Sequence, residues 1–274
     1  VGSEMCIRDS SGPLIEDRLF FFAGYEENTA SLPGLFGTKD SGAQNPASVV
    51  TTALANEIRQ YTLDNYGGYD AGYINLVTYD STHEEWTVKL DAVISDAHRA
   101  TLNVSHSEDL LPQRYNNWSR TVFSNNWYYK DPEIDRASVT LYSDWSDKLS
   151  TKLKYTSYEM LEDDSSYGDD LFPEMNITIT DSVTGDRDNV FLGGDRYRGA
   201  NLINVESEFL TFKADYNNDD HVYTFGFERD DSDVVNLFIA RYNAEVRFSS
   251  FEDYKNGVWS RLRIHEPYAG HEAV

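Results

Sequence analysis

Residues 83–109 read HEEWTVKLDAVISDAHRATLNVSHSED, and this stretch decides the fold. Apolar side chains take every second position on both sides of the short segment SDAH at residues 95–98. Alternation with period two is typical of a strand with one apolar and one polar face, and two such runs around a short turn predict a β-hairpin. The apolar row of this hairpin contains Trp86, Val88, Leu90, Ala92 and Ile94, then Ala100, Leu102 and Val104.

The same pattern returns in residues 135–159 and 208–228, which predict two further hairpins. Their turns fall near Asp147-Lys148 and in the NNDD of residues 217–220. The connections between the predicted hairpins are long, and they cover residues 28–82, 108–133 and 161–204. Short turns that alternate with long connections are the pattern of outer-membrane barrels, which have short periplasmic turns and long extracellular loops. The first long connection also predicts one helix, which starts at Thr51 and ends before Gly67-Gly68.

Composition and charge restrict the possible partners. Aromatic residues make up 14% of the chain, and no apolar run is long enough for a transmembrane helix. A net charge of −24 argues against binding to nucleic acid and against docking on an anionic leaflet. Two readings of this charge stay open, namely solubility in a salty medium and an acidic outer surface that meets cations. Cys6 is the only cysteine, so no disulfide framework is expected.

In a barrel, the apolar row of each predicted strand faces lipid and the charged row faces the lumen. If the strand with Phe20, Phe21 and Phe22 runs outward, aromatic side chains near the periplasmic turns and at the opposite edge form two interfacial girdles. Trp145, Tyr216 and Tyr223 belong to the first girdle, and Trp86 to the second. The side chains expected to face lipid are Trp86, Val88, Leu90, Leu102, Val104, Val139, Leu141, Leu153, Phe212 and Phe225.

The two ends of the chain differ from the rest. Residues 1–10, VGSEMCIRDS, resemble a translated sequencing adapter, so we expect them to be a sequencing artefact. Residues 258–274 lack a closing strand pattern, so we expect them to be the truncated end of a fragment. The barrel part is then residues 11–257.

With these residues in view, the chain resembles the TonB-dependent outer-membrane receptors, in particular their Oar-like (OmpA-related) branch. The resemblance rests on several blocks that occur in the family's order, among them SGPLIEDRLFFFAGYEE, EEWTVKLDAVISDAHRATLNVSHSED, LYSDWSDKLSTKLKYTSYE and GGDRYRGANLINVESEFLTFKADY. In this likeness the first block is the junction between a plug domain and the first barrel strand, which Phe20 to Phe22 open.

The resemblance implies an all-β fold, namely part of an antiparallel transmembrane β-barrel. This chain would supply about eight strands of a barrel with about 22, as an open curved sheet with long extracellular loops and one short helix. It also implies a receptor that imports a scarce nutrient across the outer membrane of a Gram-negative bacterium. Its partners would be outer-membrane lipid, the plug domain of the full-length protein and the energy-coupling TonB complex.

No motif for catalysis or for a cofactor stands out. A P-loop, a dinucleotide-binding glycine motif, a zinc-protease motif and a nucleophile elbow are all missing, so we expect no enzymatic activity and no cofactor. The six histidines do not show helical metal-ligand spacing, so no metal site is expected. For the unknown small ligand, the candidates are aromatic side chains of one extracellular loop, which alternatively pack that loop onto its neighbours. These candidates are Tyr115, Trp118, Trp127, Tyr128 and Tyr129.

A second class of protein stays open, namely a secreted soluble all-β binding module or carbohydrate-active protein. In such a protein the apolar rows would be buried between two sheets. In a barrel they form one exposed band about 25 Å tall. The exposure of these rows therefore distinguishes the two hypotheses.

Overall fold

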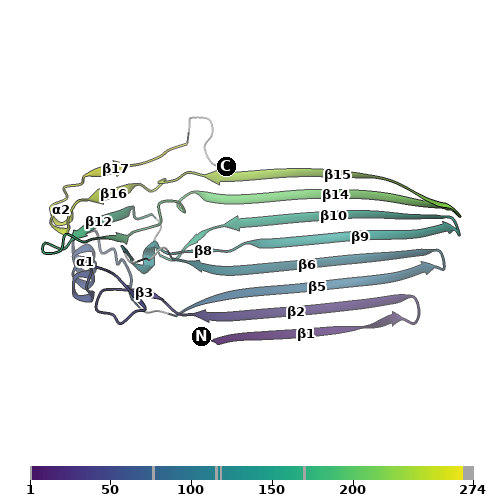
Figure 1. Ribbon diagram of the computed structural model, residues 1–274, viewed down its shortest axis with the longest axis horizontal. Helices are drawn as coiled ribbons and strands as arrows, with labels where there is room; N and C mark the ends of the chain where they lie inside the picture. Colours follow the sequence, from purple (N-terminus) through teal and green to yellow (C-terminus); the bar gives the residue numbers. More distant parts are fainter. Residues whose placement is uncertain (1, 76–77, 115–116, 118, 169–170, 268–274) are drawn as a thin grey trace.

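The computed structural model describes residues 2–75, 78–114, 117, 119–168 and 171–267. A long antiparallel sheet dominates it, and the eight main strands follow one another in chain order (Figure 1). They are β1 (Gly2–Ile15), β2 (Leu19–Leu32), β5 (Tyr79–Ser95), β6 (His98–Gln113), β9 (Glu133–Ser146), β10 (Leu149–Asp163), β14 (Asn201–Asn218) and β15 (His221–Phe238). The short strands β8 (Tyr128–Lys130) and β11 (Ser165–Ser166) extend this sheet beside β6. The predicted fold class, an open antiparallel sheet, is confirmed.

All four hairpin turns of the long sheet lie at the same end, on the right in Figure 1. Two residues each connect β5 to β6, β9 to β10 and β14 to β15, as the sequence predicted for these three hairpins. In the last of these turns Asp219 has a φ of +50°, a left-handed conformation that Asp and Asn tolerate better than most residues. Short connections at one end and long ones at the other therefore hold throughout the described sheet.

Strand β1 differs from the sequence-based expectation. Residues 1–10 are expected to lie outside the barrel, but residues 2–15 form a strand that pairs with β2 from Gly2 opposite Ser31 to Ile15 opposite Leu19. The strand with Phe20 to Phe22 is therefore the second strand of the sheet and not its edge. The artefactual origin of residues 1–10 stays a prediction.

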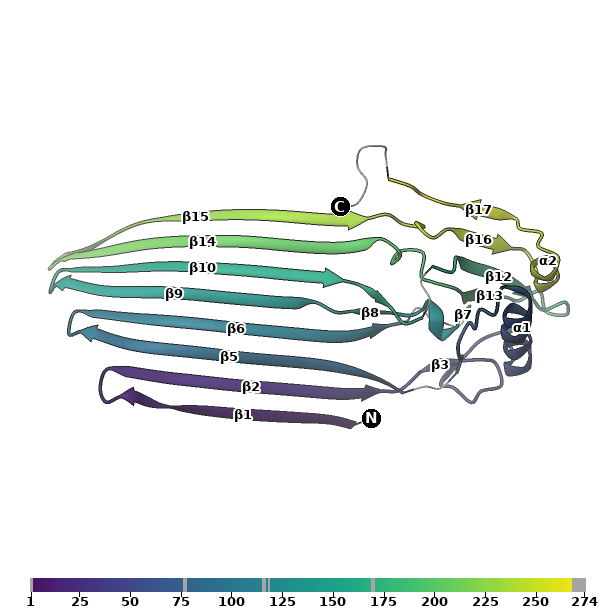
Figure 2. The same cartoon turned by 180° about the vertical axis from the view of Figure 1, so that it is seen from behind.

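The long connections fold together into a separate unit at the other end of the sheet (Figure 2). We call it the loop subdomain and define it as residues 33–75, 119–127, 171–200 and 239–263. Its main sheet has the order β17-β16-β12-β13-β7. The elements are β3 (Phe36–Gly37), β4 (Asn45–Pro46), α1 (Thr52–Asn65), β7 (Arg120–Val122), the 3-10 helix η1 (Ser124–Asn126), β12 (Glu174–Thr180), β13 (Arg187–Leu192), β16 (Glu245–Phe248), α2 (Phe251–Lys255) and β17 (Arg261–Arg263).

Helix α1 starts and packs as its sequence indicates. The Thr51 hydroxyl accepts a hydrogen bond from the backbone N–H of Leu54, which is an N-cap that satisfies a free donor of the first turn. Ala55, Ile58 and Thr62 are buried, and their spacing of three and four residues places them on one side of the helix. The predicted helix is therefore confirmed, and this buried side packs into the loop subdomain.

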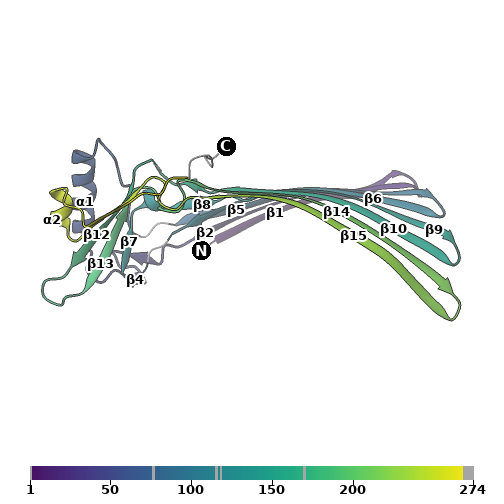
Figure 3. The ribbon, with the colours of Figure 1, turned by 90° about the horizontal axis from the view of Figure 1, so that it is seen from above.

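The hydrophobic core lies in the loop subdomain and not under the long sheet. Among the described residues, no apolar side chain of the eight main strands is buried. The core instead joins α1 and α2 to the five-stranded sheet, and its members include Ile58, Ile177, Val190, Leu192 and Tyr254. Seen from above, the long sheet is one curved layer (Figure 3). The two parts of the molecule are thus organised differently, since one has a closed core and the other has two uncovered faces.

Candidate functional site

The two faces of the long sheet have opposite chemistry, and the strand register shows this row by row. Because successive side chains of a strand point to opposite faces, neighbouring rows belong to different faces. One row, on what we call the apolar face, joins Leu19, Ala92, Ala100, Leu141, Leu153, Phe212 and Phe227. The next row, on what we call the polar face, joins Phe20, Asp91, Thr101, Thr140, Lys154, Thr211 and Glu228.

The register places all ten side chains that were expected to face lipid on the apolar face, and none of them is buried. Val139 is 49% exposed and Phe225 is 64% exposed. A soluble protein rarely exposes a continuous apolar surface of this extent. The arrangement disagrees with the soluble alternative, in which a second sheet would cover these rows. Contact with lipid itself stays a prediction.

Aromatic side chains border the apolar face on both sides. Towards the loop subdomain, the exposed Trp86 stacks on His106 with 5.8 Å between ring centroids. Towards the turns, the exposed Trp145 packs edge-on against His98 with 5.1 Å between ring centroids. Tyr216 lies opposite Tyr223 on the neighbouring strand. The two histidines are eight positions apart on β6, which is roughly 26 Å at about 3.3 Å per residue. Because barrel strands are tilted by about 35–45°, this length corresponds to a height of roughly 20 Å, which is of the same order as the apolar band of outer-membrane barrels, about 25 Å.

The register also shows to which face of the sheet each of the three consecutive phenylalanines belongs, which the sequence left ambiguous. Phe21 lies opposite Leu90 on the apolar face. Phe20 and Phe22 lie opposite Asp91 and Lys89 on the polar face, where both are exposed. The polar face therefore carries an apolar patch near the turns of β1 and β2.

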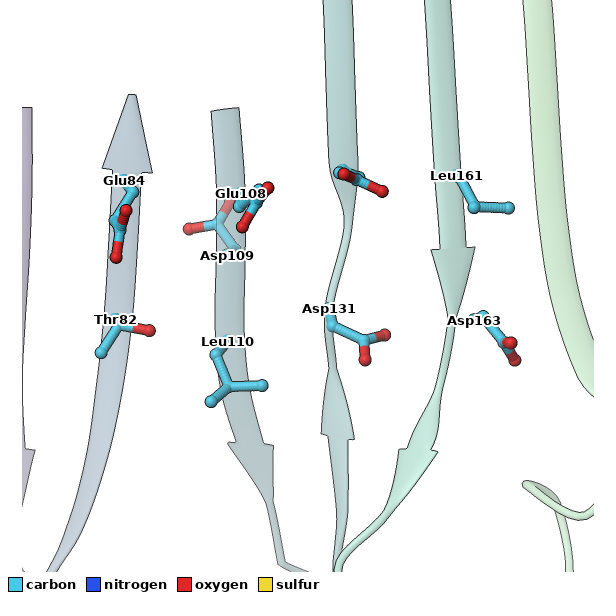
Figure 4. Close-up of a pocket in the computed structure, with 9 residues that line it drawn as sticks. Thr82, Glu84, Glu108, Asp109, Leu110, Asp131, Leu161 and Asp163 are labelled. Atoms are coloured by element: carbon cyan, nitrogen blue, oxygen red, sulfur yellow. The ribbon is translucent and has the colours of Figure 1, made fainter. Parts of the chain in front are cut away.

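From the row of Trp86 towards the loop subdomain, the apolar face becomes acidic. One row joins Trp86, His106, Asp135, Glu159, Glu206 and Asp233, and the next begins with Glu84, Glu108 and Glu133. Figure 4 shows Glu84 and Glu108 side by side on neighbouring strands. A hollow of about 540 Å³ lies here and is lined by Glu84, Glu108, Asp131, Glu133 and Asp163, together with apolar Leu110 and Leu161. This edge of the long sheet is therefore acidic, and its contact with cations stays a prediction.

Sequence reasoning missed one group within this acidic edge. His106, Glu108 and Glu133 bring three potential metal ligands within 4.8 Å of one another. Helical metal-ligand spacing does not reveal this group, because its members lie on adjacent strands. A spacing of two residues, as between His106 and Glu108, places side chains on the same face of a strand and was the available signal.

A buried ion network within the loop subdomain connects β12 and β16 to the chain segment that leads into β14. Arg196 contacts Glu174 of β12 at 2.7 Å and Glu245 of β16 at 3.0 Å. The carboxylates of Glu174 and Glu245 have no solvent exposure, and the Arg196 side chain is only 9% exposed. Arg241 adds a second contact to Glu245 at 2.6 Å. Buried charges need partners of this kind, so the network fixes these segments relative to one another.

The pKa values of the two buried carboxyl groups in this network are shifted in opposite directions. Burial raises the pKa of Glu174 to about 7, and the positive charge of Arg196 opposes this only in part. Burial also acts to raise the pKa of Glu245, but the hydrogen bonds from Arg241 and Arg247 outweigh it, so this pKa is lowered. Glu174 therefore takes up a proton near neutral pH while Glu245 stays charged.

We expect the loop subdomain to lose stability as the pH rises. Between its ordinary pKa of 4.5 and the folded value of about 7, Glu174 holds a proton only in the folded state. Stabilisation by this proton is complete below the lower value and is lost as the pH passes the upper one. The total change is on the order of 3 kcal/mol. Amide hydrogen exchange of β12 and β13, corrected for the intrinsic pH dependence of exchange, measures it.

The matched variant for this experiment is Glu174→Gln, which keeps a neutral side chain at every pH. Its pH slope should shrink but not vanish, because burial also raises the pKa of the neighbouring Asp195. An unchanged slope in Glu174→Gln would assign the pH dependence to another group.

The structure supports the packing alternative for two of the loop aromatics. Trp127 and Tyr128 are 2% and 1% exposed, and Trp127 packs with Val122 and Phe191 in a small core. Tyr129 is half-buried and stacks on Tyr167 at 5.4 Å. Tyr115 and Trp118 lie outside the described residues. Trp127 and Tyr128 therefore pack the loop onto its neighbours, and ligand binding by Tyr129 stays a prediction.

Comparison with known proteins agrees with the fold. No family model matches the chain, and no curated protein matches its sequence. Among solved structures, the chain is similar to the outer-membrane transporter YddB of Escherichia coli, with a TM-score of 0.56 and 8% sequence identity. The match covers 91% of this chain and 28% of the transporter chain.

The two proteins share a fold. At this low identity the similarity concerns the fold alone, and the chain spans about a quarter of the transporter's length. No helix of the described residues is both long and apolar enough to cross a membrane. The likeness thus supports the predicted open β-sheet fold, whereas membership of the TonB-dependent, Oar-like branch stays a prediction.

Proposed function

We propose that this chain is part of the membrane-spanning β-barrel of a TonB-dependent receptor in the outer membrane of a Gram-negative bacterium. The observation that carries the proposal is the exposed apolar face of a single sheet, bordered by aromatic side chains and opposed by a polar face. A membrane provides the cover that such a face needs. The fold shared with an outer-membrane transporter supports it.

In this proposal the polar face lines the lumen. Thr101, Lys154 and Thr211 are side chains of the kind expected beside water. Phe20 and Phe22 are exceptions on this face, and a plug domain inside the barrel would cover them. The four short turns then face the periplasm, and the loop subdomain faces the outside.

The proposed activity is energy-coupled import of a scarce nutrient and not catalysis. A siderophore, an oligosaccharide or a peptide remain the candidate ligand classes. The loop subdomain would form part of the outer mouth through which such a ligand enters. Its buried core and ion network support a preformed surface there.

Fractionation of cells that express the full-length protein tests the location. We expect the protein in the outer-membrane fraction, with a gel mobility that changes on heating, as folded barrels show. Recovery as a soluble secreted protein would favour the binding module or carbohydrate-active protein instead. Import is tested separately, since growth on the limiting nutrient should be lost when the TonB complex is removed.

A further inference from the structure

His106 lies between two carboxylates. Its Nδ1 is 2.9 Å from Oδ1 of Asp135, and its Nε2 is 2.9 Å from Oε1 of Glu108. A neutral imidazole carries one N–H and can donate to only one of these groups. The lone pair of the other nitrogen would then face a carboxylate oxygen at hydrogen-bond distance. This contact is unfavourable unless a second proton lies at that nitrogen, or the Glu108 carboxylate turns so that a metal ion lies at about 2.0–2.2 Å from both atoms.

A third carboxylate completes the donor set. Glu133 lies directly opposite Glu108, and the ligand atoms of His106, Glu108 and Glu133 lie within 4.8 Å of one another. On its other side Glu108 lies opposite Glu84. Like charges directly opposite one another on neighbouring strands are destabilising. The row has no lysine or arginine on β5, β6 or β9, so the sheet itself does not neutralise it.

The surroundings orient His106 for metal binding. If Nδ1–H donates to Asp135, the lone pair of Nε2 points towards Glu108. A carboxylate that holds the distal N–H of a histidine is a common feature of metal sites, where it fixes the tautomer and the ring orientation. The Trp86 ring stacks on the imidazole with an interplanar angle of 25° and restricts its plane from one side.

We propose that His106, Glu108 and Glu133 bind a divalent transition-metal ion and that Asp135 positions His106 for this role. One imidazole and two carboxylates form a donor set that suits zinc or manganese, with water in the remaining positions. The inference goes beyond the proposed transport function and does not depend on it, because the three ligands come from two adjacent strands of the described sheet. Bound metal would also relieve the repulsion within the acidic row.

Titration calorimetry of the full-length protein with Zn²⁺ tests the proposal, in detergent and in a buffer without phosphate. We expect a Zn²⁺ site that His106→Gln and Glu133→Gln each weaken at least tenfold. Asp135→Asn should weaken it about tenfold, as loss of such a positioning group usually does. Ca²⁺ serves as the comparison, because a merely acidic surface would bind it without needing the imidazole.

Two further measurements separate metal binding from general charge and from folding. Glu159→Gln removes the same charge from the neighbouring strand, opposite Asp135, and should leave Zn²⁺ affinity within about twofold. Glu133→Gln should keep or raise the melting temperature without metal, because it removes a like-charge contact, while lowering the gain that Zn²⁺ gives the wild type. Equal Zn²⁺ binding in wild type and both ligand variants would overturn the proposal. Lack of Zn²⁺ binding by the wild type would also overturn it and assign the geometry to a doubly protonated His106.

Discussion

Replacing Val139 with arginine should destabilise the membrane-inserted sheet by about 2–4 kcal/mol. Val139 lies in the middle of the apolar face, between Leu102 and Tyr155 on the neighbouring strands, and is 49% exposed. In the proposed membrane its surroundings are hydrocarbon, where a guanidinium has no counter-charge and little water. Urea titration of the full-length protein folding into phospholipid vesicles measures the loss.

Ser138→Arg provides the matched control, because the same charge is placed one residue away on the same strand. Ser138 lies on the polar face, opposite Asn103 and Thr156, where an arginine remains in contact with water. We expect a change below about 1 kcal/mol for this variant. Equal losses in the two variants would contradict the assignment of the faces, and a larger loss in Ser138→Arg would reverse it.

Replacing Arg196 with methionine should cost the loop subdomain about 3–5 kcal/mol. Methionine has a similar length but leaves Glu174 without its arginine partner and removes one of the partners of Glu245, and both carboxylates are buried. This loss is expected at about pH 8, where Glu174 is charged, and it arises mainly from burial of an uncompensated charge. At about pH 6 the loss should be smaller, because Glu174 is then protonated. Hydrogen exchange or limited proteolysis within residues 171–195 of the full-length protein detects it, while the long sheet should keep its protection.

The control for Arg196 is an ion pair at the turns of the long sheet, outside the proposed apolar band. Lys148 contacts Asp219 at 2.9 Å, and their side chains are 45% and 82% exposed. Lys148→Met should therefore change stability by less than about 0.5 kcal/mol. If both methionine variants have the same small effect, Glu174 and Glu245 are held by other contacts and the network around Arg196 is not what fixes the loop subdomain.

The long strands were predictable because their information is local. Alternation along residues 86–94 and 99–105 fixed which side chains share a face, and the short turns fixed the hairpin partners. The helix at Thr52–Asn65 was predictable for the same reason, since its cap and its buried side lie within one short segment.

The loop subdomain was not predictable because its pairings are distant in sequence. Strand β12 pairs in parallel with β16, and β13 pairs in parallel with β7, in each case across more than 60 residues. A short alternating run such as the MNITI of residues 175–179 does not indicate which strand it pairs with. The acidic row was missed for a related reason, because cross-strand neighbours such as Glu108 and Glu133 become visible only once the register of β6 and β9 is known.

The parallel pairs of the loop subdomain also have a consequence for the order of folding. Each long hairpin closes through a turn of a few residues, so its contacts form with little loss of chain entropy. The pairs β12–β16 and β13–β7 join connections that belong to different hairpins, and they have a high contact order. We therefore expect the loop subdomain to acquire its protection last, after the hairpins that carry its segments are already side by side. Protection of the loop subdomain would then show that neighbouring hairpins have already reached their correct order in the sheet.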